Sequence, residues 1–246
     1  VLEQGIILLK NPPQAVKLFD GKKVRVQFYF NRLGLYFITT VKSVNSGLAL
    51  VIPAVIKKIE EKKIKKINDF EALLYYSTVK ENQFVKCNFL PEYSPFSQPK
   101  WSDVEEQKQQ IAKTYLEKFV MQCRSDGKLI GNGLFLISVV RFLTQKIEQE
   151  TRSIKERKNP PSLIYVDDKK VVFACFKEDL EFNEGNEYSL VFSFPILNGP
   201  IKERTVYTEI KVEAIYEDDS QTKCCIVCDF FNIKLEDARY LEDKVK

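Results

Sequence analysis

The strongest constraint on how this chain folds is a two-residue apolar period within residues 180–246. In a first run the period is carried by Tyr188, Leu190, Phe192 and Phe194. In a second run it is carried by Val206, Thr208, Ile210, Val212 and Ala214. Successive side chains of a strand point to opposite faces of a sheet, so this period predicts two strands that are each buried on one face. The proline-containing segment 195–200 separates them as a turn.

A third strand and a helix complete this region. Residues 223–231 form another apolar run, after which one helical face carries Leu235, Ala238, Leu241 and Val245. Two strands joined by a proline turn, a hairpin to a third strand and a closing helix describe a small antiparallel barrel with a helical lid.

A second set of strands lies near the start of the chain. The first is marked by Val24, Val26, Phe28 and Phe30, the second by Tyr36, Ile38 and Thr40, and the third by Leu48, Leu50 and Ile52. Turns at residues 31–34 and at Ser46-Gly47 connect them, so a three-stranded meander is expected. Residues 84–90 are interpreted as one more strand of the same first domain.

The middle of the chain favours helices. Ser102 followed by Glu105 forms a capping box, which predicts a helix over residues 102–124. Its apolar stripe consists of Ile111, Tyr115, Phe119 and Cys123. Such a stripe packs on a core or docks a partner or a second copy. Residues 129–143 are densely apolar, and their pattern fits a buried strand or a buried helix.

A charged segment divides the chain. Residues 146–158 read KIEQETRSIKERK, and the proline pair that follows Asn159 restarts the chain in an extended state. We therefore expect a β-barrel domain with a helix over residues 1–140, a charged connection over residues 141–161 and a second β-barrel domain over residues 162–246. The expected fold class is mainly β with accessory helices, as two small antiparallel β-barrels joined by a charged, helical connection.

The composition narrows the chemistry. The chain has no histidine, which removes Ser-His-Asp and Cys-His catalysis and histidine metal ligands. It also lacks a P-loop and a G-x-G-x-x-G motif, so we expect a non-enzymatic protein with no catalytic residues, cofactor or metal. Cys225 and Cys228 spell C-x-x-C, but positions three apart in a strand point to opposite faces and cannot share a metal.

The cysteine spacing and the hydropathy of the sequence indicate the cellular compartment in which the protein is expected. The six cysteines are irregularly spaced in a chain too long for a disulfide scaffold, which indicates reduced thiols. No apolar run approaches the roughly 20 residues of a membrane helix, and the first residues lack the features of a signal peptide. A soluble, cytoplasmic protein without a membrane span is expected.

The cationic run from Lys57 to Lys66 has two interpretations. Clustered lysines attract polyanions, so the run can be a phosphate-binding stripe. A solvated helix or strand face is the favoured interpretation, because Glu60 and Glu61 interrupt the positive field and a lysine run alone is a weak motif.

The C-terminal pattern resembles the second half of a PilZ domain. The residues that carry the resemblance are Leu180, Gly185, Tyr188, Leu190, Phe192 and Pro195, followed by residues 206–214, residues 226–230 and the helix with Asp237, Arg239 and Leu241. Residues 21–24, the meander, Ile52-Pro53 and the basic run are similar to the barrel that precedes PilZ in flagellar-brake-type proteins. The histidine-free, lysine- and phenylalanine-rich composition is similar to that of spirochaetal members.

The resemblance implies a ligand. PilZ domains bind cyclic di-GMP through an R-x-x-x-R motif ahead of the barrel and a [DN]-x-S-x-x-G motif on an early strand. In this chain the second motif corresponds to residues 167–172, with Asp167 kept, Lys169 in the serine position and Val172 in the glycine position. Arg141 has Gln145 four residues on, and Arg152 and Arg157 are five apart. The candidate ligand-binding residues are Arg141, Gln145, Arg152, Arg157, Asp167 and Lys169.

Three functions follow as hypotheses. The first is a PilZ-type cyclic di-GMP receptor that relays the second messenger to a protein partner such as the flagellar motor. The second is a degenerate PilZ adaptor that acts by protein contact without the nucleotide. The third is nucleic-acid binding through residues 57–66 and 152–158. The connection around Arg152 and Arg157 either grips the dinucleotide or serves as a charged linker.

Overall fold

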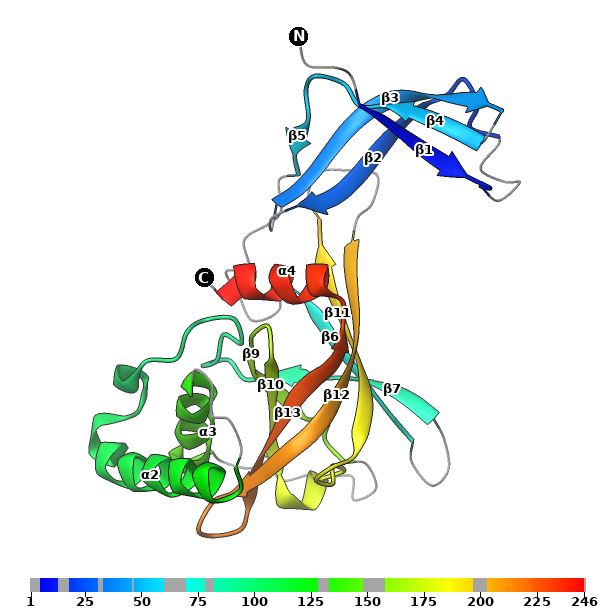
Figure 1. Ribbon diagram of the computed structural model, residues 1–246. Coiled ribbons are helices and arrows are strands. Elements are labelled where there is room, and N and C mark those ends of the chain that lie inside the picture. The colour runs from blue at the N-terminus through cyan, green and yellow to red at the C-terminus, as the bar shows by residue number, and fades with distance from the viewer. Residues whose placement is uncertain are drawn as a thin grey trace. The chain divides into compact units, whose positions relative to one another are not determined.

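The computed structural model describes residues 5–12, 18–30, 33–45, 47–59, 70–77, 82–127, 133–147, 158–196 and 203–245. The chain divides into two compact units, residues 1–62 with 196–202 and residues 63–195 with 203–246. Each unit contains a curled, mainly antiparallel sheet, and the described helices belong to the second unit (Figure 1). The expected fold class, mainly β with two barrel-like sheets and a few helices, is confirmed.

The first unit is the expected meander with two additional strands. Its strands are β1 (Ile6–Lys10), β2 (Lys23–Phe30), β3 (Leu33–Val44), β4 (Gly47–Val51) and β5 (Lys57–Lys58), in the order β1-β4-β3-β2 with β5 beside β3. β3 pairs with β2 through its first eight residues and with β4 through its last four, so the sheet curls. Val41, Leu48 and Leu50 form its small core.

The sheet of the second unit curls into a nearly closed barrel. Its strands are β6 (Glu71–Ser77), β7 (Asn82–Lys86), β8 (Asn88–Phe89), β9 (Ser162–Val166), β10 (Lys170–Phe176), β11 (Glu187–Pro195), β12 (Glu203–Glu217) and β13 (Lys223–Ile233). Their order is β7-β6-β11-β12-β13-β10-β9-β8. The two ends of this order, β7 and β8, are consecutive segments separated only by Cys87, whose N–H donates to the Ala72 carbonyl at 2.9 Å. The same stretch of chain therefore joins both edges of the sheet.

The division between the units differs from the expected boundary at residue 140. β6 pairs with β11 from Glu71↔Ser193 to Tyr75↔Ser189, and β7 pairs with β6. Residues 84–90 thus belong to the second barrel and not to the first. An alternating pattern predicts a strand but not its partner, and the pairing that places β6 in the second barrel joins it to β11, more than 100 residues away in the sequence.

Two apolar layers hold the second unit together. Inside the barrel, side chains such as Phe173, Phe192 and Ile226 form one cluster. On the outer face, Val172, Ala174 and others pack beneath α2 (Gln109–Ser125) and α3 (Leu134–Thr144). β10 and β13 are consequently buried on both faces, which explains their continuous apolar sequences.

The two cysteines of the C-x-x-C sequence belong to different apolar clusters. Cys228 lies in the interior cluster and Cys225 in the outer one, so the expected opposite orientation of the C-x-x-C pair is confirmed. All six thiols are free and buried. Burial raises the pKa of the Cys87 and Cys175 thiols to about 12, so at neutral pH they stay protonated and behave as small apolar groups.

The helices correct two expectations and decide an alternative that the sequence left open. α2 begins at Gln109 and not at Ser102, because residues 101–108 form two short 3-10 turns, in the first of which the Asp103 carboxylate accepts the Lys100 N–H at 2.8 Å. In the apolar stripe, Ile111 is exposed and Ala112 takes its place on the buried face. The ambiguous residues 129–143 contribute a helix, α3. The closing helix α4 (Leu235–Val245) is confirmed.

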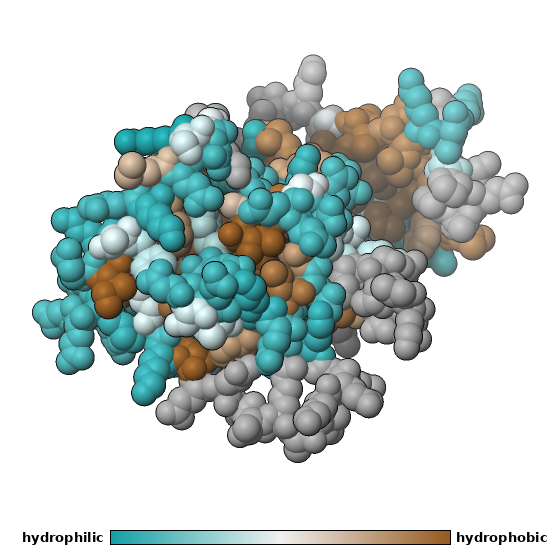
Figure 2. All heavy atoms as spheres, turned by 90° about the horizontal axis from the view of Figure 1, so that it is seen from below, coloured by the Kyte–Doolittle hydropathy of each residue, from teal (hydrophilic) through white to brown (hydrophobic). Residues whose placement is uncertain are grey.

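Both hydrophilic and apolar side chains are visible on the face of the protein in Figure 2. In the described ranges no helix combines the length and hydropathy that crossing a bilayer requires.

Gly47 provides a test of the first sheet. Its φ is +141°, and a Cβ there would lie 2.0 Å from the Leu9 carbonyl oxygen, whereas Gly21 (φ +71°) has open space around it. Gly47→Ala should lower the free energy of unfolding by about 3 kcal/mol, and Gly21→Ala by only about 1 kcal/mol. Denaturant titration followed by circular dichroism measures both.

Fluorescence of the single tryptophan distinguishes unfolding of the second unit from unfolding of the first. Trp101 belongs to the second unit, so its fluorescence transition should not move in either variant. Equal losses in the two variants would contradict the strained contact at Gly47.

Candidate functional site

Arg141 and Gln145, at the end of α3, are engaged with the segment that follows β8. The Arg141 Nη2 donates to the Glu92 carbonyl at 2.8 Å, and its guanidinium lies 4.3 Å from the centre of the Tyr93 ring. The Tyr93 hydroxyl donates to Gln145 Oε1 at 3.1 Å, and Gln145 Nε2 donates to Glu92 at 3.3 Å. These two candidates therefore fasten residues 92–93 to α3.

A lysine that the sequence did not single out holds the same helix end. Lys223 Nζ donates to the carbonyls of Phe142, Leu143 and Gln145 at 3.1, 2.6 and 2.6 Å. A cation is stabilised at a helix C-terminus, where the carbonyls carry partial negative charge. Burial lowers the pKa of Lys223, although the Asp218 carboxylate opposes this. The one feature of the sequence that could have indicated this role is the position of Lys223 at the start of an apolar strand.

Asp167 shapes the hairpin between β9 and β10. Its Oδ1 accepts the N–H groups of Lys169 and Lys170 at 2.7 and 2.6 Å, and its Oδ2 accepts the Tyr165 hydroxyl at 2.7 Å. A short acidic side chain that binds the following backbone amides is typical of a turn. Lys169 is exposed, and its carbonyl accepts the Phe230 N–H.

The position where the PilZ pattern has glycine is closed. Val172 is fully buried in the outer cluster with residues of α2 and α3. A glycine would allow a ligand to approach the backbone. In this chain a valine side chain and the helical layer fill that space.

The register of β10 places the candidates at two opposite ends of the strand. Lys170 pairs with Asp229 at the hairpin end, and Phe176 pairs with Lys223 at the other end. Gln145 is bound to Lys223, so the end of α3 lies far from Asp167 and Lys169. β10 has seven residues, which corresponds to about 20 Å. The structure does not bring Arg141 and Gln145 together with Asp167 and Lys169.

The charged connection ends at a fixed point of the barrel rim. Arg152 and Arg157 lie outside the described residues. Lys158, which follows them, pairs with Glu181 at 2.6 Å. The Asn159 N–H and Nδ2 donate to the Asp179 carboxylate at 3.0 and 3.3 Å. Asp179 follows β10 at the end opposite to the Asp167 hairpin, and sequence reasoning missed it because it belongs to no motif.

The basic run of the first unit is described only in part. Lys57 and Lys58 form β5 and are exposed. Lys62 and Lys66 lie outside the described residues. The choice between a phosphate-binding stripe and a solvated face therefore stays a prediction.

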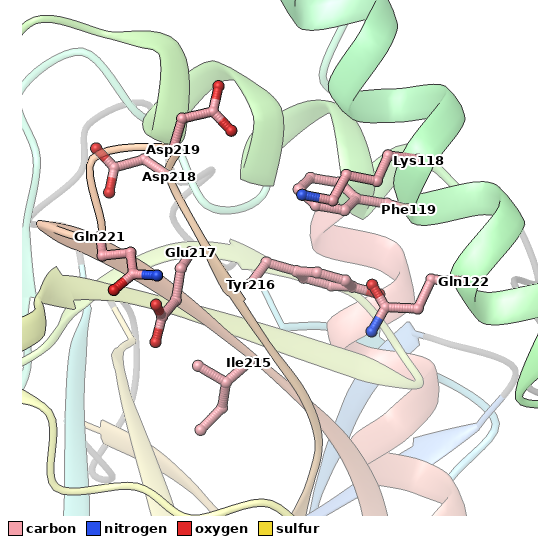
Figure 3. Close-up of a pocket in the computed structure, with 9 residues that line it drawn as sticks. All are labelled: Lys118, Phe119, Gln122, Ile215, Tyr216, Glu217, Asp218, Asp219 and Gln221. Atoms are coloured by element: carbon pink, nitrogen blue, oxygen red, sulfur yellow. The ribbon is translucent and has the colours of Figure 1, made fainter.

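A hollow of about 340 Å³ lies between α2 and the turn that joins β12 to β13 (Figure 3). Its lining is formed by Lys118, Phe119, Gln122, Ile215, Tyr216, Glu217, Asp218, Asp219 and Gln221. Three carboxylates against one ammonium group disfavour an anionic ligand.

Two of these carboxylates make interactions within the protein. Glu217 pairs with Lys177 at 2.8 Å. The Asp218 carboxylate accepts the N–H groups of Thr222 and Lys223 at 2.7 and 2.8 Å. Burial opposes ionisation of Asp218, but these hydrogen bonds outweigh it and lower the pKa of the carboxyl. The hollow is thus part of the framework that holds the turn beside α2.

Comparisons with known proteins give similar solved structures only. No family model matches the chain, and no curated protein matches it. The chain is similar to the Bacillus subtilis inhibitor of motility MotI/DgrA, with 12% identity and a TM-score of 0.31 over 92% of this chain and 72% of that one. It is also similar to K. pneumonia MrkH in its c-di-GMP complex, with 11% identity and a TM-score of 0.29 over 98% of this chain and 74% of that one. Values this low do not identify a family.

Substitutions of the two neighbouring aspartates in the hairpin, Asp167 and Asp168, should change the free energy of unfolding in opposite directions. Asp167→Ala removes an acceptor shared by three donors and should lower the free energy of unfolding by about 1–3 kcal/mol. Asp168 has its pKa raised by burial and by the Asp167 carboxylate. The folded state therefore disfavours the ionised Asp168, and Asp168→Asn should stabilise the protein at pH 7.

The pH dependence completes this test. The pKa of Asp168 in the folded state lies above its ordinary value of 3.8. Below pH 3.8 this carboxyl is largely protonated in both the folded and the unfolded states, so the stability gained by Asp168→Asn should disappear there. Urea titrations at pH 7 and pH 3.5 measure it. A loss of stability in Asp168→Asn at pH 7 would contradict the assigned roles.

Proposed function

We propose that this chain is a PilZ-type effector that binds cyclic di-GMP at the rim of the second barrel and passes its ligand state to a protein partner. The observation that carries the proposal is the anchorage of the connection at Lys158 and Asn159, immediately ahead of β9. The PilZ resemblance puts the ligand-binding arginines directly ahead of the barrel. Here Arg157 is one residue from the anchored point.

The residue types suit the ligand. Cyclic di-GMP has two phosphates and two guanine rings. A guanidinium offers a planar fork of donors to a phosphate and a face that stacks on a base. The connection carries Arg152, Lys155, Arg157 and Lys158. We infer that Arg152 and Arg157 bind the dinucleotide and that Arg141, Gln145 and Asp167 keep the structural contacts described above.

Titration calorimetry of the full chain with cyclic di-GMP tests the proposal. Each charge-assisted contact stabilises a complex by about 1.5–3 kcal/mol, so Arg152→Ala and Arg157→Ala should each weaken binding by roughly tenfold or more. Arg124→Ala, at the exposed end of α2, and Lys169→Ala should leave the affinity unchanged. Absence of heat at high micromolar ligand with folded protein removes the proposal.

A degenerate adaptor is the second candidate. It is favoured by Val172, which closes the glycine position, and by the engagement of Asp167, Arg141 and Gln145 with their own chain. In that case the protein captures the same partner with and without cyclic di-GMP. Capture that requires the nucleotide would exclude this alternative.

A further inference from the structure

One end of the first unit brings together three segments that are distant in the sequence. The turn at residues 18–21 is held against β3 because the Gly21 N–H donates to the Val41 carbonyl at 2.9 Å, and the Ser43 N–H donates to Asp20 Oδ1 at 2.7 Å. Lys10 at the end of β1 pairs with Gly47, which follows the turn after β3. We call these residues, 10, 18–22 and 42–44, the basic-apolar end.

Large apolar side chains protrude from the basic-apolar end. Leu18 is 73% exposed, Phe19 48% and Val44 42%. Exposed apolar side chains are unevenly distributed over the protein, because ten of the sixteen large ones in the described ranges belong to the first unit. Single exposed apolar residues need no explanation, but a group at the tips of neighbouring turns indicates a binding surface.

Three exposed lysines belong to the same end of the sheet. Lys10, Lys22 and Lys42 are exposed, and in the described residues none of them takes part in an ion pair. The charge of the whole unit has the same sign. The first unit contains 11 lysines and arginines against 4 acidic residues, whereas the second contains 27 against 30. The first unit therefore has a net positive charge, and the second has a small net negative charge.

We propose that the basic-apolar end binds the surface of an anionic lipid bilayer. Each lysine near such a surface contributes about 1 kcal/mol of attraction. Leu18 and Phe19 supply the apolar side chains that enter the region between headgroups and acyl chains. The opposite charges of the two units favour an approach in which the first unit meets the membrane. The binding site is separate from the barrel rim proposed for the dinucleotide.

A bilayer fits these residues better than other polyanions. Leu18 and Val44 have no aromatic face on which a base can stack, so their exposure adds nothing to nucleic-acid binding. A stable protein interface involves about 20–30 residues on each side, which is more than the basic-apolar end offers. Binding to a bilayer needs no matching set of partner residues, because its strength follows the apolar area that enters the interface and the attraction of lysines to anionic lipids.

Sedimentation with vesicles tests the proposal on the full chain. The protein without nucleotide is mixed with phosphatidylcholine vesicles or with vesicles that also contain about 30% phosphatidylglycerol. Binding to the anionic vesicles alone is expected. The double variant K22E/K42E should bind at least about thirtyfold more weakly, because two attractive charges become repulsive. The double variant L18S/F19S should lose binding as well.

Matched controls lie at the opposite end of the same sheet. K57E/K58E makes the same change in net charge on β5, which pairs with β3 at Leu35 and Tyr36. Phe30→Ser removes an exposed apolar side chain at the end of β2. Both should retain vesicle binding, and circular dichroism verifies that each variant is folded.

Three outcomes of the vesicle assay would overturn the proposal. They are no binding of the parent chain to anionic vesicles, equal losses in K22E/K42E and K57E/K58E, and unchanged binding by L18S/F19S. Binding of duplex DNA that competes with the vesicles and is unaffected by L18S/F19S would assign the surface to nucleic acid instead. Because no nucleotide is present, these results are independent of the cyclic di-GMP titration.

Discussion

Burial of β10 and β13 on both faces is the constraint on which the second unit depends. One face of each strand lines the barrel, with residues such as Phe173 and Ile226, and the other lies under α2 and α3, with residues such as Val172 and Cys225. A strand that is apolar on both faces requires cover on both, since exposed apolar area is unfavourable by about 25 cal/mol per Å². The helices are therefore part of the barrel domain and not a separate connection.

This helical cover determines what the candidate site residues do. α3 is fastened at its end by Lys223, and Arg141 and Gln145 attach the neighbouring segment to it. Lys170 marks the other end, where it pairs with Glu213 and Asp229 and lies 5.1 Å from the centre of the Phe135 ring. Side chains that resemble ligand-binding residues in sequence thus hold the helical layer in place. The ligand site that we propose, at the rim where the connection enters, does not involve these side chains.

The sequence predicted local structure well and long-range assembly poorly. The two-residue period identified β11, β12 and β13, and α4 followed from a helical stripe, because these patterns depend only on neighbouring residues. Assignment of residues 84–90 to the first barrel was wrong, because β6 pairs with β11 and β7 pairs with β6. Ser102 failed as a helix start because Asp103 stabilises a 3-10 turn there.

The candidate site shows the same limit. Asp167 was identified from a motif, but a turn-capping aspartate and a ligand-binding aspartate look alike in sequence. The partners that distinguish them are the amides of Lys169 and Lys170 and the Tyr165 hydroxyl. Asp179 at the rim belongs to no motif, and its contact with Asn159 appears only once β10 has been placed beside the end of the connection.

Amide hydrogen exchange with and without cyclic di-GMP tests most directly the claim that the ligand meets the connection at the barrel rim. We expect slower exchange on ligand addition in residues 150–162 and around Asp179, with no change in the Asp167 hairpin or in residues 90–96. Protection confined to the hairpin or to the Arg141 segment, with none in residues 150–162, would contradict it.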